Sequence, residues 1–517
     1  MSPLNILAVA SEIYPLVKTG GLADVVGALP AALGLHGITV KTMIPGYPAV
    51  LAAIEGRTVL HRFADLWGGA ATLIAGTAKG LELFALDAPH LYGRPGNPYL
   101  GPDGKDWPDN AQRFAALGKV AADIARGLVP SFAPHVLHAH DWQAALAPAY
   151  LRFGEPCATK SLVTIHNLAF QGWFPAALFS SLNFPAAAYA IDGIEYYGGV
   201  GYLKAGLQCA DAITTVSPTY AREICTPEGG MGLEGLLRAR QNVLSGIVNG
   251  IDTNVWNPAT DEQIAAPYDA KRLNRRATNK RAIEQRFGLS PNMGLLYCIV
   301  GRLTGQKGMD LVIESIDALV ETGGRLALLG SGDHALESAF SSAAKRHPGR
   351  IGVVLGYDEG LSHLLQAGSD VLLVPSRFEP CGLTQLHGLR YGCVPLVSRV
   401  GGLADTVIDA NDAALSAGVA TGIQFSPVAQ PSLVSALTQA ADLFRDWKAW
   451  RGMQRRGMRA DVSWQRRAGR YAALFYELCG IHTASAASNE GGNYQDRRDP
   501  VVQRTVARNV GAADTHS

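Results

Sequence analysis

A short apolar run followed directly by a helical segment constrains the fold of this chain more than any other feature. Val371 to Val374 is short enough to be a buried parallel strand, and Leu383 to Tyr391 has the look of a helix that Gly392 closes. Residues 379–382, which read Glu-Pro-Cys-Gly, lie in the loop between them. Ligands of open α/β sheets bind at such loops, at the carboxyl ends of the strands. We therefore expect an α/β fold with a ligand site at this loop.

The residues of this loop suggest which ligand it binds. Gly382 allows a ligand to approach the backbone closely, and the free N–H groups of the following helix suit a phosphate. A carboxylate such as Glu379 is poorly placed beside an anion unless it meets sugar hydroxyls. The combination suggests a sugar joined to a phosphate. The alternative is that Glu379 is an ordinary surface residue and Cys381 a small packing residue.

The whole second half of the chain alternates apolar strands with amphipathic helices, which is typical of a doubly wound parallel sheet. The predicted strands are Leu295–Val300, Arg325–Leu329, Ile351–Leu355, Val371–Val374 and Val394–Val397. Arg302 and Lys307 lie in a glycine-bearing loop after the first of these strands, where they could clamp a pyrophosphate. A solvated charged loop is the alternative for this pair.

The first half begins with the same pattern. Asn5 to Ala10 reads as a buried strand, and Gly20-Gly21 opens a helix that extends to about Leu35. Lys18 precedes the glycines, so this loop could wrap a diphosphate, although a plain tight turn remains possible. Residues 401–407 repeat residues 20–26 almost letter for letter. We therefore predict two Rossmann-like lobes that face a shared cleft.

Length and composition exclude several other classes. A chain of 517 residues is too long for one core, so two domains are expected. A net charge of +1 gives no field that favours nucleic acid or an anionic membrane. Seven cysteines without CxxC pairing argue against a disulfide framework or a zinc site. No apolar run approaches about 18 residues, so we expect no membrane span and a cytoplasmic location.

Three further patterns each have two interpretations. His138 and His140 share a strand face and could be a metal pair, although a structural or sugar-contacting role is favoured. The many aromatic residues between Phe170 and Tyr202 could form a glycan-binding wall or a hydrophobic cap. Residues 330–335 contain G-x-G-x-x-A after a strand, which would suit a dinucleotide oxidoreductase. The oxidoreductase hypothesis does not explain the charged residues of the other loops.

Six motifs together identify a family. They are KTGGLADVV at Lys18, HAHDWQ at His138, TIHNLAFQG at Thr164, VNGID at Val248, GRLTGQKG at Gly301 and EPCGLTQL at Glu379. These motifs resemble those of bacterial glycogen synthases and plant starch synthases, in order from about residue 5 to 480. The resemblance implies a GT-B glycosyltransferase, with two Rossmann-like doubly wound domains around a deep interdomain cleft.

From these motifs and the composition we predict four parts. Residues 1–248 would be the N-terminal acceptor and catalytic domain, and residues 249–460 the C-terminal ADP-glucose-binding domain. The resemblance implies that residues 461–480 are a helix that crosses back to the first domain. Residues 481–517 are polar and read as a disordered tail.

The resemblance also implies the reaction. Glucose would pass from ADP-glucose to the non-reducing 4-hydroxyl of an α-1,4-glucan, glycogen or a malto-oligosaccharide, with retention of configuration. ADP-glucose would be a substrate, and no cofactor or metal is expected because two cations would neutralise the departing ADP. A noncatalytic glucan-binding protein on the same scaffold is the alternative, but it would not need these cations together with the loop carboxylate.

By position, the resemblance assigns roles to individual residues. Catalytic roles fall to Glu379 on the glucose hydroxyls, to Arg302 and Lys307 on the departing ADP, and to Asp141 and His166 on the opposite wall. Substrate-binding roles at the donor phosphates fall to Lys18, Gly20 and Gly21, and those at the distal phosphate fall to Gly382, Leu383 and Thr384. Asn167 would lie beside the sugar and Tyr357 against adenine. The remaining predicted substrate-binding residues are Tyr92, Asn249 and Cys381. His387 stands where the wider GT-B pattern has a second glutamate, so its role is left open.

Overall fold

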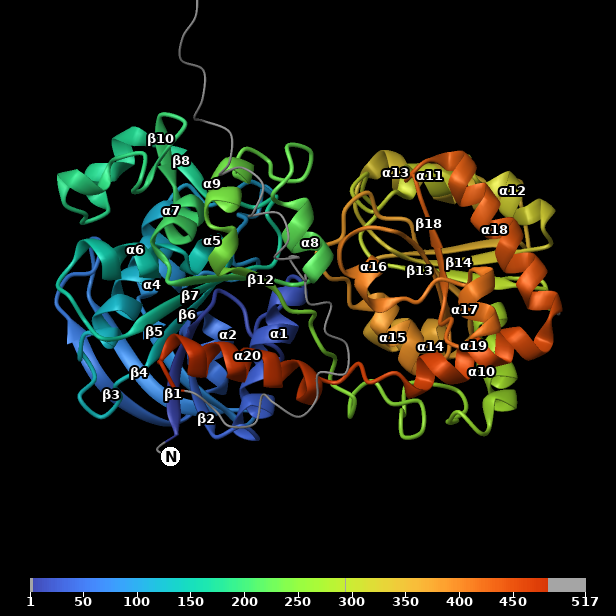
Figure 1. The fold of residues 1–517 in the computed structure, drawn as a ribbon, viewed down its shortest axis with the longest axis horizontal. Helices are drawn as coiled ribbons and strands as arrows, with labels where there is room; N and C mark the ends of the chain where they lie inside the picture. The colour runs from blue at the N-terminus through green and yellow to red at the C-terminus, as the bar shows by residue number, and fades with distance from the viewer. Residues whose placement is uncertain (1–2, 293, 482–517) are drawn as a thin grey trace, which may run out of the picture.

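The structure, a computed structural model, describes residues 3–292 and 294–481. The chain forms two lobes that lie side by side, each built around a largely parallel β-sheet (Figure 1). The alternation of strands and helices predicted for the second half of the chain is confirmed. Both lobes therefore have the α/β architecture expected from the sequence.

The first lobe contains a nine-stranded sheet in the order β12-β11-β7-β6-β1-β2-β5-β4-β3. Its strands are β1 (Leu4–Val9), β2 (Ile38–Pro45), β3 (Glu55–Phe63), β4 (Ala71–Ala78), β5 (Leu81–Asp87), β6 (Val136–His140), β7 (Lys160–Ile165), β11 (Ala212–Thr215) and β12 (Leu244–Gly246). All neighbours pair parallel except β3 with β4 and β4 with β5, which pair antiparallel. A separate small sheet, β8-β10-β9, is formed by β8 (Trp173–Pro175), β9 (Glu195–Tyr196) and β10 (Gly199–Gly201).

The second lobe contains a six-stranded parallel sheet in the order β15-β14-β13-β16-β17-β18. Its strands are β13 (Leu296–Val300), β14 (Arg325–Gly330), β15 (Ile351–Leu355), β16 (Val371–Val374), β17 (Val394–Ser398) and β18 (Ile423–Phe425). The sequence predicts the first five of these strands within a residue or two. It misses β18, because three residues at the edge of a sheet are too few to show a pattern.

Helices connect these strands in both lobes. In the first lobe they are α1 (Gly21–Gly34), α2 (Pro48–Ala53), α3 (Pro89–Tyr92), α4 (Asn110–Ala125), α5 (Asp141–Ala144), α6 (Leu146–Phe153), α7 (Tyr202–Cys209), α8 (Pro218–Glu223) and α9 (Glu234–Ala239). In the second lobe they are α10 (Arg276–Phe287), α11 (Met309–Glu314), α12 (Ile316–Glu321), α13 (His334–Arg346), α14 (Glu359–Gly368), α15 (Thr384–Tyr391), α16 (Gly401–Thr406), α17 (Asp412–Ser416), α18 (Gln430–Arg445) and α19 (Trp447–Arg459). Short 3₁₀ helices cover Ala176–Ser181, Ala186–Ala188, Gln241–Val243 and Leu273–Arg275.

Apolar side chains on both faces bury each sheet. In β1, Leu7 and Val9 join the large core of the first lobe, whereas Leu4 and Ile6 join a second core on the opposite face. Successive side chains of a strand point to opposite faces, so a continuous apolar run serves both cores. This double burial leaves the loops at the strand ends as the places where polar side chains gather.

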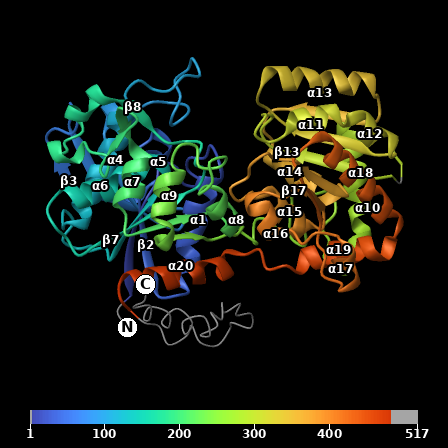
Figure 2. The same ribbon diagram turned by 45° about the horizontal axis from the view of Figure 1, so that its top comes forward.

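The chain crosses between the lobes twice, and the two crossings lie together. The backbone N–H of Ile251 donates to the carbonyl of Val462 at 2.9 Å. A Cβ on Gly250 would lie 2.5 Å from the backbone nitrogen of Trp464, so only glycine fits there. After the second crossing, α20 (Trp464–Leu478) packs against α1 in the first lobe (Figures 1 and 2). The division at residues 248, 460 and 480 stays a proposal, and the predicted tail lies outside the described residues apart from Ile481.

No helix in residues 3–292 and 294–481 is long and apolar enough to cross a membrane.

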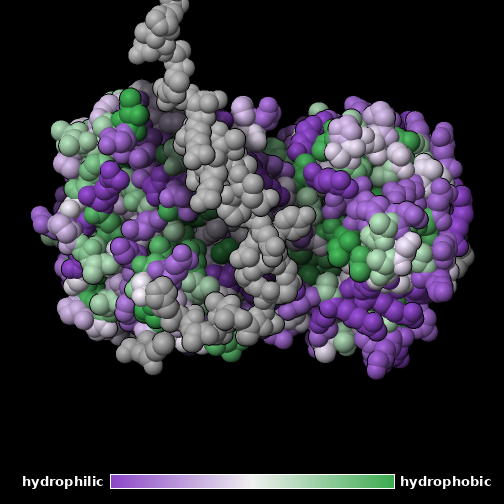
Figure 3. All heavy atoms as spheres, in the orientation of Figure 1, coloured by the Kyte–Doolittle hydropathy of each residue, from purple (hydrophilic) through white to green (hydrophobic). Residues whose placement is uncertain are grey.

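On the face shown in Figure 3, hydrophilic side chains cover much of the second lobe, with small hydrophobic patches between them. Large exposed apolar side chains occur in both lobes: Phe170, Trp173 and Tyr197 of the first lobe and Tyr357 and Trp447 of the second are at least half exposed.

Candidate active site

The loops after two neighbouring strands of the second lobe bring the predicted charged residues together. Strands β13 and β16 pair in the sheet, so the loops that follow them start side by side. The first loop carries Lys307 and the second carries Glu379, and the Lys307 Nζ lies 2.5 Å from the Glu379 Oε2. Two residues 72 positions apart in sequence therefore form one ion pair at the carboxyl edge of the sheet.

Glu379 is held firmly by its surroundings. Its side chain is 8% exposed, and Oε2 accepts a second hydrogen bond from the Ser376 hydroxyl at 2.9 Å. Its carbonyl accepts the N–H of Gly402 at 3.0 Å, and a Cβ on Gly401 would lie 2.0 Å from the same carbonyl oxygen. The glycine pair of α16 thus permits close packing against the Glu379 loop. Within the described residues, Oε1 of Glu379 has no hydrogen bond and stays open to a ligand.

Arg302 lies in the same loop as Lys307 but has a different environment. It is exposed, and it forms no ion pair within the part of the chain that the structure describes. Its guanidinium is therefore available to an anion. Following Glu379, Gly382 adopts a left-handed conformation with φ of 72°, and α15 starts at Thr384. The first N–H groups of a helix have no partner within it, so residues 382–384 offer backbone donors in the same region.

The glycine loop of the first lobe is organised by Glu12, which the sequence analysis missed. The Glu12 carboxylate accepts the backbone N–H groups of Thr19 and Gly20, and the Thr19 hydroxyl at 2.6 Å. Lys18 is paired with Asp24 at 2.8 Å. The structure therefore places Lys18 at the predicted loop, but with its charge already partnered. Glu12 lies in the same loop, between β1 and α1, but it belongs to no motif, which is why the sequence does not reveal its role.

Asp141, His166 and Asn167 lie together at the ends of β6 and β7. The Asp141 carboxylate accepts the His166 N–H at 2.7 Å, and Asp141 has the left-handed φ of 56°. Burial raises the pKa of Asp141 to about 7, while the N–H groups of His166 and Asn167 act in the opposite direction. Burial also lowers the pKa of His166 to about 3. This part of the site therefore holds a neutral imidazole next to a carboxyl group with a raised pKa.

The two sides of the site face each other across the lobes. A Cβ on Gly21 would lie 3.6 Å from the Leu383 side chain. We use the name interlobe site for eight residues, four from each lobe. The first lobe contributes Lys18, Gly21, Asp141 and His166, and the second contributes Arg302, Lys307, Glu379 and Leu383. Both lobes contribute residues to this group.

A pair of reciprocal helix contacts holds the lobes together beside this site. The Asp405 carboxylate of α16 accepts the N–H and the hydroxyl of Thr219 in α8, each at 2.7 Å. In return, the Glu223 carboxylate of α8 accepts the N–H of Gly401 in α16 at 2.9 Å. We call Thr219, Glu223, Gly401 and Asp405 the interlobe latch. Because Gly401 packs on the Glu379 loop, the latch touches the site directly.

Four further residues with a predicted substrate-binding role have different surroundings. Tyr92 is fully buried in the first core, and its hydroxyl donates to the Arg113 carbonyl. Its position does not support the predicted ligand contact, because neither its ring nor its hydroxyl reaches the surface. Asn249 and Cys381 are 5% exposed, and Cys381 packs with Val216 and Val248 at the lobe junction. Tyr357 is 76% exposed, with its hydroxyl bonded to Glu359 at 2.7 Å.

His387, whose role the sequence left open, belongs to a stack of three rings. His387 stacks on one face of Trp256 with centroids 3.6 Å apart, and His363 stacks on the other face at 3.8 Å. Burial lowers the pKa of His387 well below its usual value, and the charges of His363 and Lys18 act in the same direction. The structure thus gives His387 an aromatic neighbour that no local sequence pattern indicates.

The glycine motif of the oxidoreductase hypothesis has a packing role. A Cβ on Gly330 would lie 2.1 Å from the Gly301 carbonyl, and one on Gly332 would lie 2.3 Å from the Leu303 carbonyl. These glycines therefore support the loop that carries Arg302. In the described residues, no three metal-ligating side chains of the His, Cys, Asp or Glu type gather into a site.

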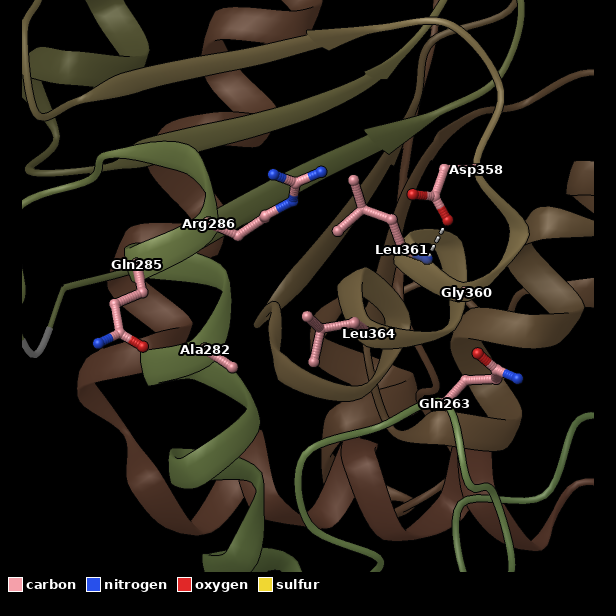
Figure 4. A pocket seen from close by; sticks show the side chains of 8 residues that line it. All are labelled: Gln263, Ala282, Gln285, Arg286, Asp358, Gly360, Leu361 and Leu364. Atoms are coloured by element: carbon pink, nitrogen blue, oxygen red, sulfur yellow. Dashed lines mark hydrogen bonds between the residues drawn. The ribbon is translucent and has the colours of Figure 1, made fainter.

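A surface pocket of the second lobe does not coincide with the interlobe site. It lies on the surface of the second lobe between α10 and α14, with a volume of about 540 Å³ (Figure 4). Gln285 and Arg286 come from α10, whereas Leu361 and Leu364 come from α14. Side chains of the interlobe site do not line it.

Comparisons with known proteins match both lobes. The family model for the starch synthase catalytic domain matches residues 5–239, and the model for group 1 glycosyl transferases matches residues 280–441. Glycogen synthase from Rhodopseudomonas palustris (strain BisA53) is 59% identical over 479 residues, which cover 92% of this chain and 98% of that protein. The chain belongs to the glycogen and starch synthase family.

Other members and more distant structures agree with this assignment. A glycogen synthase from Acidiphilium cryptum is 58% identical and covers 92% of this chain and 99% of its own length. The catalytic domain of starch synthase IV from Arabidopsis thaliana, a structure bound to ADP and acarbose, aligns with a TM-score of 0.83 and 31% identity over 93% of this chain and all of that one. Sucrose-phosphate synthase from Thermosynechococcus elongatus shares the fold, with a TM-score of 0.57. It is 16% identical, and the alignment covers 92% of this chain and 99% of that one. The predicted GT-B fold and family are confirmed.

Proposed function

We propose that this chain is a glycogen synthase, an enzyme that transfers glucose from ADP-glucose to the non-reducing end of an α-1,4-glucan. The observation that carries this proposal is the near-complete match to curated glycogen synthases, at 57–59% identity over 98–100% of three of them. The ADP and acarbose in the starch synthase IV structure support a nucleotide donor and a glucan-like acceptor. A cytoplasmic location stays a prediction.

The interlobe site provides the chemistry that this transfer needs. In the reaction the bond from glucose C1 to the ADP oxygen breaks, and a bond from C1 to the acceptor O4 forms on the same face. Negative charge builds on the departing phosphate, where Arg302 and Lys307 are in one loop to neutralise it. That phosphate accepts the proton of the acceptor hydroxyl. Oε1 of Glu379 holds glucose hydroxyls, and Asp141 and His166 complete the opposite side.

The donor can be tested directly. Purified enzyme should incorporate glucose into glycogen with a higher kcat/KM for ADP-glucose than for UDP-glucose, because the family match extends through the loops that carry Lys18 and Glu379. Incorporation of labelled glucose at several donor concentrations gives both constants. Equal or higher kcat/KM with UDP-glucose would contradict the proposed donor, and no incorporation from either would contradict the function.

The interlobe latch predicts how the lobes respond to mutation. The double variant D405N/E223Q should open the molecule, because each change weakens a charge-assisted hydrogen bond at a helix N-terminus. Small-angle scattering should show a larger radius of gyration, and KM for ADP-glucose should rise by roughly tenfold, the effect of about 1.4 kcal/mol.

The matched control for the latch is D442N. Asp442 is an exposed carboxylate of α18 that pairs with Arg445 inside the second lobe, so its loss should change neither the radius of gyration nor KM. If the double variant scatters like the wild type with and without ADP, these contacts do not hold the lobes closed.

A further inference from the structure

One buried histidine outside the proposed catalytic set contacts a histidine inside it. His140 and His138 lie on the same face of β6, and both are 1% exposed. The His140 Nδ1 lies 3.0 Å from the His166 Nε2, in hydrogen-bond distance. This is the only hydrogen bond of the His140 side chain within the described residues.

We propose that His140 is a positioning residue for the transfer reaction, which fixes the orientation and the tautomer of His166 through this hydrogen bond. The inference rests on the proposed function, because it assigns His166 to the sugar side of the interlobe site. His140 itself touches neither donor nor acceptor, since it is buried behind His166. It acts only through the imidazole that it holds.

The environment of the pair determines which nitrogen carries the proton. Both rings are neutral, since burial lowers the pKa of His140 well below its usual value and that of His166 to about 3. Around the rest of its ring, His140 lines a small cavity together with Val26, Leu29 and Leu33. The ring of His138 lines the same cavity, with its centroid 4.0 Å from that of His140, and it forms no hydrogen bond with His140 in the described residues. A buried N–H without an acceptor is rare, so the single proton of His140 belongs on Nδ1, where it is donated to His166. His166 then keeps its own proton on Nδ1.

This proton assignment has a chemical consequence. With Nε2 accepting from His140, the His166 ring is anchored at one end and offers an N–H donor at the other. A donor next to the sugar suits a hydroxyl oxygen, whereas the opposite tautomer would present a lone pair. The His166 backbone is fixed as well, because its N–H donates to the Asp141 carboxylate. Backbone and ring are thus held by two different neighbours.

His138 shows that burial alone does not produce this role. Its Nε2 lies 2.7 Å from the Thr164 hydroxyl, and its ring packs against Tyr471 and Phe475 of α20. His138 and His140 come from the same strand and have equal exposure, but only His140 contacts His166. The His138 ring also packs on the His140 ring, with centroids 4.0 Å apart. Because H138L leaves the His140–His166 hydrogen bond in place, His138 is a control for the loss of a buried histidine from this strand.

The test compares H140L with H138L in the full-length enzyme. Both variants should lower Tm, because each loses a buried hydrogen bond. H140L should also lower kcat by roughly ten- to a hundredfold with little change in KM, the scale of a misplaced reacting group. H138L should keep kcat within about twofold. Equal losses of kcat in the two variants would show a merely structural role for His140 and overturn the proposal.

A double-mutant cycle and a rescue sharpen the test. In the H166A background, H140L should cause no further loss of kcat, because a positioning residue has nothing left to position. H140N should recover part of the activity, since its amide nitrogen can sit near the Nδ1 position and donate to His166. Multiplicative losses in the cycle, or no recovery with H140N, would contradict the proposal.

A spectroscopic measurement separates this inference from the proposed function. In enzyme labelled with ¹⁵N-histidine and assigned by difference with H166A, the wild-type His166 should show a protonated Nδ1 and an unprotonated Nε2. H140L should abolish that tautomer preference. A protonated Nε2 in the wild type would overturn the assignment, whether or not the enzyme uses ADP-glucose.

Discussion

Replacement of either Arg302 or Lys307 by alanine is expected to lower kcat by roughly a hundredfold or more, the scale of losing one preorganised transition-state donor. Both cations lie in one loop after β13, and the negative charge that they would meet grows as the glycosidic bond breaks. Steady-state kinetics with ADP-glucose and glycogen measure the loss. K345A is the control, because Lys345 is an exposed lysine at the end of α13 in the same lobe.

The two single variants should differ in stability. Lys307 pairs with a carboxylate whose side chain is 8% exposed, so K307A leaves that buried charge with Ser376 as its remaining partner. Removing one partner of a buried pair is destabilising, so K307A should lower Tm. R302A should leave Tm almost unchanged, since Arg302 is exposed and pairs with no carboxylate in the described residues. K307R should restore only part of the activity that K307A loses, because the planar guanidinium of arginine is a poor substitute for the compact ammonium of lysine.

Coupling between the two cations gives a second measurement. If Arg302 and Lys307 act on the same charge, the double variant should lose less than the product of the two single losses. A variant whose KM rises while kcat stays within about threefold would instead have lost ground-state binding. That result for both residues would show that neither stabilises the transition state selectively.

The sequence predicts the parts of this site that depend on strand ends, and it misses those that depend on tertiary contacts. Lys307 and Glu379 follow neighbouring parallel strands, so their meeting follows from the fold. Neither the Lys18–Asp24 pair nor the Glu12 contacts to the Thr19 loop can be inferred from a motif, because each requires the loop conformation. Tyr92 shows a different limit, since the resemblance implies a substrate-binding role for it and the structure places its ring in the core.

The contacts across the lobes illustrate the same limit. Asp405 and Glu223 belong to ordinary helix sequences 182 positions apart, and only the packing of α8 on α16 brings each carboxylate to the other helix. The Trp256 ring has no ring contact with residues 249–262, all of which the structure describes, yet it stacks between two histidines of the second lobe. Periodicity reports which side of an element is buried, but not which distant element buries it.

Substitution of Glu379 by glutamine should nearly abolish transfer, with a fall in kcat of roughly a thousandfold, while ADP binding is retained. Gln has the same shape, but one carboxylate oxygen becomes an NH₂ group. Lys307 and Ser376 both donate toward Oε2, so the amide oxygen must take that position and the NH₂ group must replace Oε1. Oε1 is the oxygen left open to glucose, and a donor there cannot accept a hydroxyl proton.

Calorimetry with ADP alone separates sugar binding from phosphate binding. E379Q should bind ADP with unchanged Kd, because its proposed partner is the sugar, whereas R302A should bind ADP more weakly. S376A is the control for disturbance of the loop: it removes one donor to Oε2, leaves Oε1 intact and should cost far less kcat than E379Q. Lost ADP affinity in E379Q together with unchanged affinity in R302A would reverse the two roles and place the nucleotide at Glu379.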